Sequence, residues 1–319
     1  MFEALLSNNR MKAELSRAIT ENRPMHAYLF CGAEGSGKLT AAKLCAAYLV
    51  GKNADKVERD SHPDIFILRP EADKKLITVE QVRKMRQDAF VHPTEAPRKI
   101  YIVDGVQLMN EAGQNALLTI LEQPPAHAIF ILLSERREAV LPTVISRCAV
   151  FEMEYVEASE GAELLKKLVP DAEQGKLLTA MRAAEGNIGL AAKLASSETF
   201  AKSVTASQML LKAVAEKNEY KVQLILSRPS KDELLDFLPV LAMYIRDVIV
   251  YRMTGSEDRL VFKESVLQNI NDFDKININI LYDGVAGCEK AVMLINSYVS
   301  VPLIVSALGI QLCGGKQID

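Results

Sequence analysis

The first part of the chain alternates short apolar runs with segments of helical hydrophobic spacing. Apolar runs that predict buried strands lie at residues 27–32, 64–68, 99–104, 128–134 and 149–153. Helical spacing or good helix formers predict helices at residues 10–22, 39–50, 77–90 and 110–122. Alternation of strands and helices predicts a mostly parallel sheet with helices on both faces.

After about residue 155 the pattern becomes helical only. The predicted helices lie at residues 160–169, 174–185, 189–197, 206–217, 219–227, 231–254, 276–295 and 299–313. Ser230 is followed three residues later by Glu233, a capping-box signature that predicts a helix start there. We therefore expect an α/β domain at residues 1–155, a small helical domain at 156–205 and a larger helical domain at 206–319.

The composition is that of an ordinary globular protein, with 49% hydrophobic and 25% charged residues among 319. A net charge of −3 argues against a broad basic face that grips bare nucleic acid. Four cationic side chains remain candidates for phosphate contacts, although solvated surface charge is the simpler interpretation: Lys74, Lys75, Arg136 and Arg137.

The cysteines indicate a reduced chain. The 5 cysteines are scattered and form no C-x-x-C pair, which is typical of a cytoplasmic protein without a disulfide framework. The first residues do not resemble a signal peptide, and no apolar run is long enough to span a membrane. Residues 49–64 contain no cysteine and only one histidine, His62, so we expect no structural zinc.

Residues 32–40, G-A-E-G-S-G-K-L-T, nearly match the phosphate-binding pattern G-x-x-x-x-G-K-[ST]. Leu39 stands where the pattern has the hydroxyl that binds Mg²⁺. Backbone N–H groups at a helix N-terminus can still cradle phosphate, so ATP or ADP is a candidate ligand. The alternative is a simple glycine turn between a strand and a helix. The candidate nucleotide-binding residues of this loop are Gly32, Gly35, Gly37, Lys38 and Thr40.

Two further residues carry candidate chemistry. Asp104 ends the apolar run Y-I-V-D and has the position of a Walker B acid beside the loop, and the alternative is that it caps the next turn. The residue after it is Gly105, which cannot orient an attacking water. Arg147, in S-R-C, could stabilise a phosphate on another subunit, and its alternative interpretation is a surface salt bridge.

Several motifs occur in the order found in one family. They are H-A-Y-L-F-C-G (26–32), H-P-D (62–64), I-T-V-E-Q-V-R (77–83), N-A-L-L-T-I-L-E-Q-P-P (115–125) and L-P-T-V-I-S-R-C (141–148). Together with the loop, they resemble the clamp-loader branch of the AAA+ ATPases, in bacterial DNA polymerase III. The resemblance spans nearly the whole chain and is most specific at residues 26–148. It implies an α/β P-loop (AAA+) domain with a parallel sheet, followed by an all-α lid and an all-α collar domain.

The resemblance also implies partners and roles. Clamp-loader subunits (tau/gamma and delta) would join this chain in a hetero-pentamer that loads the sliding clamp onto primed DNA. Arg147 would act in trans on a neighbour's ATP, and Lys38 and Asp104 would belong to a remnant ATP site. A motor subunit would have a hydroxyl at 39, an acid at 105 and an arginine near 189, whereas the chain has Leu39, Gly105 and Gly189. We therefore expect a stator without efficient ATP hydrolysis. The alternatives are a hydrolysing motor subunit, or another AAA+ protein such as a helicase loader.

Overall fold

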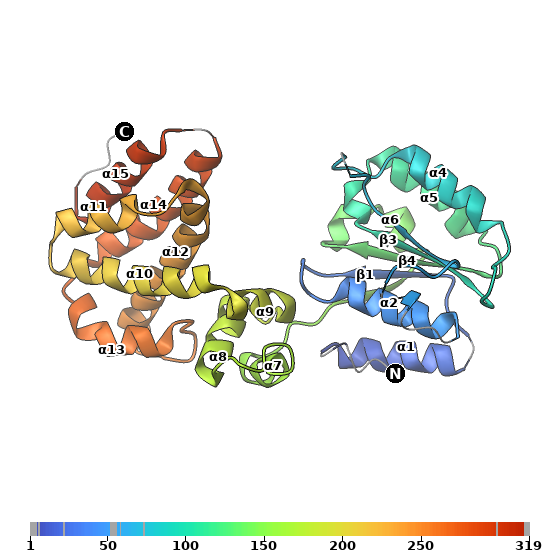
Figure 1. Cartoon of the computed structure of the whole chain (residues 1–319), viewed down its shortest axis with the longest axis horizontal. Helices are drawn as coiled ribbons and strands as arrows, with labels where there is room; N and C mark the ends of the chain where they lie inside the picture. The colour runs from blue at the N-terminus through green and yellow to red at the C-terminus, as the bar shows by residue number, and fades with distance from the viewer. Residues whose placement is uncertain are drawn as a thin grey trace. The chain divides into compact units, whose positions relative to one another are not determined.

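The computed structural model describes residues 5, 7–21, 23–51, 56–57, 59–72, 74–297 and 299–315. The chain forms two compact units (Figure 1). The first consists of Met1–Glu157 and Asn187–Leu190, and the second of Ala158–Gly186 and Ala191–Asp319. The first unit has α/β layers, and the described residues of the second are helices and their connections.

The first unit is built on a parallel sheet with the strand order β2-β3-β4-β1-β5. The strands are β1 (Ala27–Cys31), β2 (Ile65–Leu68), β3 (Lys99–Asp104), β4 (Ala128–Ser134) and β5 (Ala149–Glu152). Every residue of β1 and β4 is buried, because helices cover both faces of these central strands. The prediction of a parallel α/β domain followed by helical segments is confirmed.

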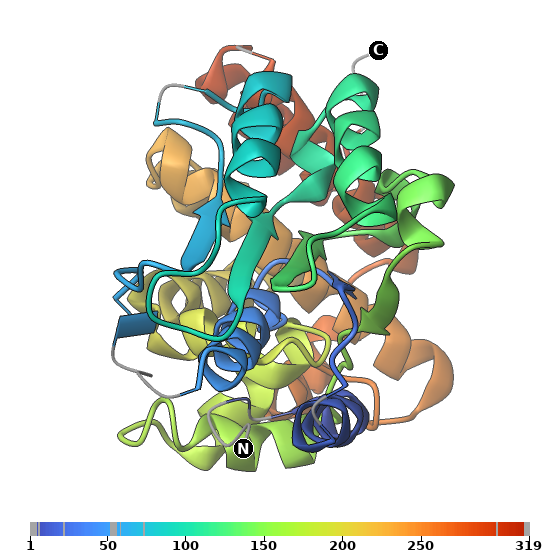
Figure 2. The same ribbon diagram turned by 90° about the vertical axis from the view of Figure 1, so that its right-hand side faces the viewer.

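Helices pack on both faces of this sheet. One face carries α1 (Asn9–Thr20) and α2 (Lys38–Leu49), and the other carries α4 (Val79–Ala89), α5 (Glu111–Glu122) and α6 (Pro142–Ile145). Two short 3₁₀ turns, η1 (Val106–Leu108) and η2 (Arg137–Ala139), follow β3 and β4. Alternate side chains of β1 enter the two cores, with Phe30 on the α2 side and Leu29 on the α4 side. Figure 2, which faces this unit, shows α4 and α5 in cyan and green on one side of the sheet and α2 in blue on the other.

The second unit is described as helices α7 (Ala158–Leu165), α8 (Gln174–Ala183), α9 (Ile188–Ser196), α10 (Glu198–Ala215), α11 (Glu219–Ser227), α12 (Lys231–Thr254), α13 (Lys263–Phe273), α14 (Ile278–Asn296) and α15 (Val301–Leu312). The first residues of α9 belong to the first unit. Tyr244 of α12 lies in the core, with its ring centroid 5.4 Å from that of Phe262 and 6.1 Å from that of Phe273. The predicted capping box at Ser230 and Glu233 is confirmed. Among the described residues, no helix is long and apolar enough to cross a membrane.

Two helical segments differ from the predictions. The helix α13 was not predicted, because its buried Val266 and Phe273 are separated by asparagine and aspartate, which are weak helix formers. The helix predicted from residue 206 begins at Glu198, where the Ser197 side chain accepts a hydrogen bond from Phe200 N at 3.1 Å. The expected boundary between the two helical domains, at residues 205 and 206, thus lies within α10, and the three-domain division stays a prediction.

Candidate nucleotide and arginine sites

The carboxyl ends of three strands meet at one edge of the sheet. Gly32 N, directly after β1, donates to Ser134 O at 3.0 Å, and Gly105 N, directly after β3, donates to Leu133 O at 3.2 Å. Parallel α/β sheets bind ligands at this edge. The structure therefore brings the glycine loop and Asp104, the last residue of β3, to the same edge.

The loop after β1 retains the backbone geometry of a phosphate cradle. Gly35 and Gly37 have φ angles of 82° and 88°, a left-handed conformation that glycine adopts without strain. Gly37 is the N-cap of α2, so the helix N-terminus begins at Lys38. A Cβ at Gly32 would come within 2.7 Å of the Met153 Cβ, which explains glycine at the first position of the motif.

The Lys38 ammonium is bonded to its own loop. Its Nζ donates to Gly32 O at 2.5 Å and to Ala33 O at 2.8 Å. In P-loop proteins this lysine reaches the β- and γ-phosphates of the nucleotide. Burial lowers the pKa of Lys38, and the nearby Glu135 and Asp104 oppose that change. The Lys38 ammonium thus finds its hydrogen-bond acceptors within the loop rather than at the edge of the sheet.

The two positions after Lys38 do not supply a hydroxyl to the loop. Leu39 packs against the core on the α2 side of the sheet. Thr40 is exposed, and residues two apart on a helix do not face the same way. A role for Thr40 in binding Mg²⁺ or nucleotide stays a prediction.

Residues 187–190 lie against the glycine loop. Asn187, which is only 5% exposed, donates from Nδ2 to Glu34 O at 2.7 Å. Gly189 N donates to Gly35 O at 3.1 Å, and a Cβ built at Gly189 would overlap that same oxygen. The sequence showed that arginine is missing at 189, but it did not reveal this contact. The structure shows that the backbone here approaches the loop too closely for a side chain at 189.

The Asp104 carboxylate is paired with a cation that the sequence analysis missed. Arg69, directly after β2, donates from Nε to Asp104 Oδ2 at 2.9 Å. The Arg69 guanidinium also lies 3.8 Å from Asp60, which pairs with Lys43 at 2.6 Å. The available signal in the sequence was that Arg69 directly follows a predicted strand, as Asp104 ends another. A carboxylate with the position of a Walker B acid is thus part of an ion-pair network.

These residues fit a Mg²⁺–triphosphate only in part, since Leu39 supplies no hydroxyl for the metal. Lys38 and Asp104 are both engaged within the protein, and Gly105 offers no acid. Within the described ranges, no group of three or more His, Cys, Asp or Glu side chains could hold a metal ion. His62 Nδ1 accepts a hydrogen bond from Asp64 N at 3.1 Å, which is a structural role for that imidazole. The expected absence of zinc stays a prediction.

Arg147 lies away from this edge. It precedes β5, whose first residue, Ala149, pairs with Tyr28 near the start of β1. Gly32 comes four residues further along β1, about 13 Å away at the usual rise of a strand. Arg147 donates from Nη1 to Thr143 O at 2.8 Å and from Nη2 to Glu122 Oε1 at 2.5 Å, and its side chain remains 33% exposed. The structure therefore does not bring Arg147 to the chain's own glycine loop.

The candidate phosphate contacts outside the loop are exposed. Lys74 pairs with Glu71 at 2.7 Å, and Arg137 lies 3.6 Å from Glu152. Lys75 and Arg136 are also exposed. Exposed pairs of this kind contribute little to stability, and contact with DNA stays a prediction for all four cations.

The chain matches one family and several characterised relatives. The profile of the family described as "DNA polymerase III, delta subunit" matches residues 7–157. DNA polymerase III subunit delta' of Bacillus subtilis is 26% identical over 276 residues, which cover 80% of each chain. Subunit delta' of Pseudomonas aeruginosa is 31% identical over 180 residues, 53% of this chain and 55% of that one. Subunit tau of Bacillus subtilis is 29% identical over 204 residues, 59% of this chain but only 36% of tau.

The parallel sheet, the glycine loop after β1 and the acid that ends β3 define an α/β domain of the P-loop type. Together with the matches, they make the chain a clamp-loader subunit of DNA polymerase III, in the family of delta', tau and gamma subunits. Within that family, the two delta' relatives support a place with the delta' subunits.

Proposed function

We propose that this chain is the stator of a bacterial DNA polymerase III clamp loader. It would assemble with tau/gamma and delta subunits into a hetero-pentamer that loads the sliding clamp onto primed DNA. Its direct chemical contribution would be Arg147, presented to ATP that a neighbouring subunit binds. The proposed role requires no nucleotide on this chain.

The position of Arg147 is the observation that carries the proposal. It lies beyond the amino end of β5, whereas the chain's own loop follows the carboxyl end of β1. An arginine so far from its own loop can act on a phosphate only across a subunit boundary. A guanidinium suits that task because it is planar, permanently charged and able to donate several hydrogen bonds. With its side chain 33% exposed, Arg147 is accessible to a neighbour.

The glycine loop supports a stator rather than a motor. Lys38 is held by two carbonyl groups of its own loop, and Asp104 is held by Arg69. The loop also contacts Gly189, where a side chain that senses the γ-phosphate has no room. Metal positioning, water activation and charge sensing each lower the barrier to hydrolysis, and each 1.4 kcal/mol lost costs about tenfold in rate. The loss of all three is consistent with a subunit that does not hydrolyse ATP efficiently.

Exposed apolar side chains in the second unit support an assembly role. Met253, Met293 and Leu303 are 65%, 70% and 65% exposed, although each lies on a helix that also contributes to the core. Isolated exposed apolar residues need no explanation, but large ones on several helices of one unit are typical of surfaces that partners cover. We expect the partners to be other subunits of the same loader.

The test is the clamp- and DNA-stimulated ATPase rate of a loader reconstituted from purified subunits. Arg147→Ala should lower the rate by about tenfold or more, since arginines of this kind contribute several orders of magnitude to phosphoryl transfer. Lys38→Ala should change it little. Arg17→Ala, which removes an exposed arginine of α1 from the same unit, serves as the matched control.

The opposite pattern would reject the proposal. If Lys38→Ala abolished a large share of the activity while Arg147→Ala did not, the chain would be a motor whose loop rearranges on binding ATP. Equal small effects of all three variants would mean that neither site contributes to the ATPase cycle.

A further inference from the structure

The strand β2 is the outer strand of the described sheet on the α4 side, and part of its backbone points outward. Ile100 N donates to Asp64 O at 2.9 Å, and the parallel register pairs Phe66 with Tyr101. Backbone groups of alternate residues face opposite edges of a strand, so those of Phe66 point toward β3. The N–H and C=O of Ile67 therefore point away from the sheet, where another strand could bind them.

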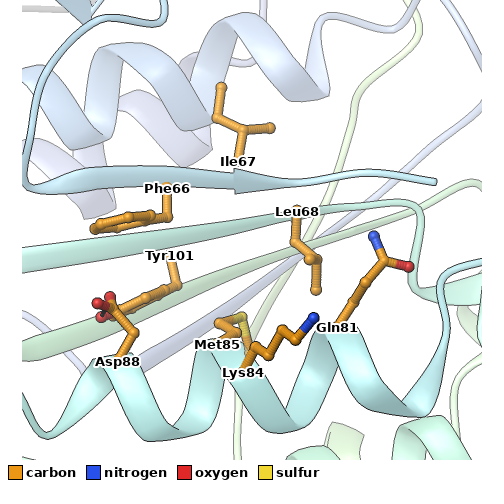
Figure 3. Close-up of a pocket in the computed structure, with 8 residues that line it drawn as sticks. All are labelled: Phe66, Ile67, Leu68, Gln81, Lys84, Met85, Asp88 and Tyr101. Carbon is orange, nitrogen blue, oxygen red and sulfur yellow. Dashed lines mark hydrogen bonds between the residues drawn. The ribbon is translucent and has the colours of Figure 1, made fainter. Parts of the chain in front are cut away.

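A groove runs along this outer strand. It has a volume of 380 Å³ and lies between β2 and α4 (Figure 3). Figure 3 shows Phe66 and Leu68 pointing from β2 toward α4, with Met85 rising from the helix to meet them. Phe66 is 38% exposed, so its ring is accessible to a ligand in the groove.

The floor of the groove is rigid. The Phe66 ring stacks on Tyr101 at 5.4 Å, and Tyr101 stacks on the buried Phe130 at 5.2 Å. The Tyr101 hydroxyl donates to Asp88 Oδ2 at 2.7 Å, and Lys99 Nζ lies 2.8 Å from the same oxygen. Phe66 is thus the exposed end of an aromatic stack that is already held in place, so a ligand would meet a formed surface.

The helix α4, which forms one wall of the groove, carries three basic and two acidic side chains and so has a small net positive charge. Asp88 is compensated by Lys99, which is nearly buried. Lys84, on the α4 wall, pairs with Glu80 at 3.1 Å, and both side chains are more than 70% exposed. Such exposed i,i+4 pairs contribute only about 0.3–0.5 kcal/mol, so Lys84 can exchange its partner for a ligand carboxylate. Arg83, the next residue along α4, is also exposed.

We propose that the groove between β2 and α4 binds an extended acidic segment of a partner polypeptide, which adds to the sheet as a strand beside β2. Its backbone would bond with the outward N–H and C=O of Ile67. Alternate apolar side chains would lie on Phe66 and Leu68, and an acidic side chain would face Lys84. Peptides recognised by strand addition gain affinity from the backbone and specificity from alternate side-chain pockets. A second copy of this chain is a poorer occupant, because pairing two β2 edges would bring like-charged α4 surfaces together.

The experiment selects peptides from a displayed library of random octapeptides on the immobilised full-length chain. The most enriched peptide is then labelled with fluorescein and titrated against variants by fluorescence anisotropy. Ile67→Pro removes the outward N–H at a position where an edge strand tolerates proline. Phe66→Ala removes the aromatic floor of the groove, and Lys84→Glu reverses the charge of the side chain that would face the acidic ligand. Lys202→Glu is the matched control, because Lys202 forms the same kind of exposed i,i+4 pair on another helix.

Enriched peptides should carry apolar residues at alternate positions and a net negative charge. Their dissociation constant should rise about tenfold or more in Ile67→Pro and Phe66→Ala, as expected when backbone pairing or the main apolar contact is lost. Lys84→Glu should weaken binding in low salt, and Lys202→Glu should not. If Ile67→Pro fails to fold by circular dichroism, Phe66→Ala and Lys84→Glu decide the test.

Three outcomes would overturn the proposal. They are a library that yields no enriched peptide, enriched peptides without alternation whose binding Phe66→Ala leaves unchanged, and a concentration-dependent dimer that Ile67→Pro dissociates. The last outcome would make a second copy of the chain the occupant.

Discussion

The Arg147 guanidinium and the Glu122 carboxylate form an ion pair, with 2.5 Å between Nη2 and Oε1. Glu122 is the last residue of α5, and Arg147 comes two residues after the end of α6. Thr143 O accepts a second hydrogen bond from the same guanidinium. A long side chain fixed at two points loses less conformational freedom when it meets a phosphate, so the pair prepares Arg147 for its proposed role.

Glu122→Ala should therefore lower the stimulated ATPase rate of a reconstituted loader by about threefold to tenfold, less than Arg147→Ala. The expected cause is a less ordered Arg147 side chain. Glu111→Ala, which removes another glutamate of α5, is the control. In an Arg147→Ala background, Glu122→Ala should have no further effect, because both changes remove one interaction. A rise in activity would instead mean that Glu122 restrains Arg147.

The contact between residues 187–190 and the glycine loop should limit access of nucleotide to the loop. Asn187→Ala removes the hydrogen bond to Glu34 O and leaves that segment less tightly held. We expect the variant to bind ATP more tightly than the wild-type chain, without gaining hydrolysis. Equilibrium dialysis with labelled ATP measures the change, and Ser197→Ala, which removes a helix cap outside this contact, is the control. Unchanged or weaker binding would show that the contact does not limit access.

Asp64 should be a major source of stability in the first unit. Its carboxylate accepts hydrogen bonds from Thr94 N, Glu95 N and Ala96 N at 2.6, 2.7 and 2.8 Å. Asp64→Ala should lower the free energy of unfolding by about 3 kcal/mol, since it removes three hydrogen bonds to a charged acceptor. Urea denaturation at pH 7 measures the loss. A loss under about 1 kcal/mol would mean that water replaces the carboxylate.

The same carboxylate sets a pH dependence. Burial alone would raise the pKa of Asp64, but the three backbone N–H donors outweigh it and hold that pKa below its usual value. A depressed carboxyl pKa stabilises the folded chain above the unfolded pKa of about 4, and this contribution is lost as pH falls through the folded pKa. The stability difference between wild type and Asp64→Ala should therefore be constant from pH 7 to pH 5 and shrink below pH 4.

Asp247 in α12 should give stability the opposite pH dependence. It is fully buried, and burial raises the pKa of its carboxyl, although Phe262 N donates to it at 2.7 Å. A raised carboxyl pKa favours folding at low pH, and that contribution is lost as pH rises through the folded pKa. Asp247→Asn, which mimics the neutral acid, should be more stable than wild type at pH 8 and equal to it near pH 4. If Asp247→Asn were less stable than wild type at pH 8, the ionised carboxylate would be the form that stabilises the fold through its hydrogen bond from Phe262 N.

The sequence predicted the strands and most helices because burial leaves a clear pattern. Residues of β4 are buried without exception, and the apolar run at 128–134 has the length and the β-branched and aromatic content of a buried strand. The start of α4 shifted by two residues from the prediction, because Thr78 is its N-cap and forms a capping box with Gln81. Such boundaries depend on single hydrogen bonds, which periodicity does not detect.

The candidate site could be predicted in part. Glycines, Lys38 and Asp104 follow from a motif and from the rule that strand ends meet at one edge. Arg69 follows a predicted strand directly, but its pairing with Asp104 depends on the order of the strands in the sheet, which local pattern does not give across 35 residues. The contact of Gly189 with Gly35 spans a still longer separation, and a missing arginine in the sequence carries no information about what lies in its place.

Two glycines limit which catalytic side chains this backbone could carry. Gly105 has a φ of 101°, and a Cβ there would come within 2.8 Å of Leu108 Cδ1. At Gly189 the backbone leaves no space before the Gly35 carbonyl. Glutamate at 105 or arginine at 189 would therefore be strained before it could meet a nucleotide. A lineage with this backbone would have to reshape two loops before a point mutation at 105 or 189 could supply a catalytic side chain.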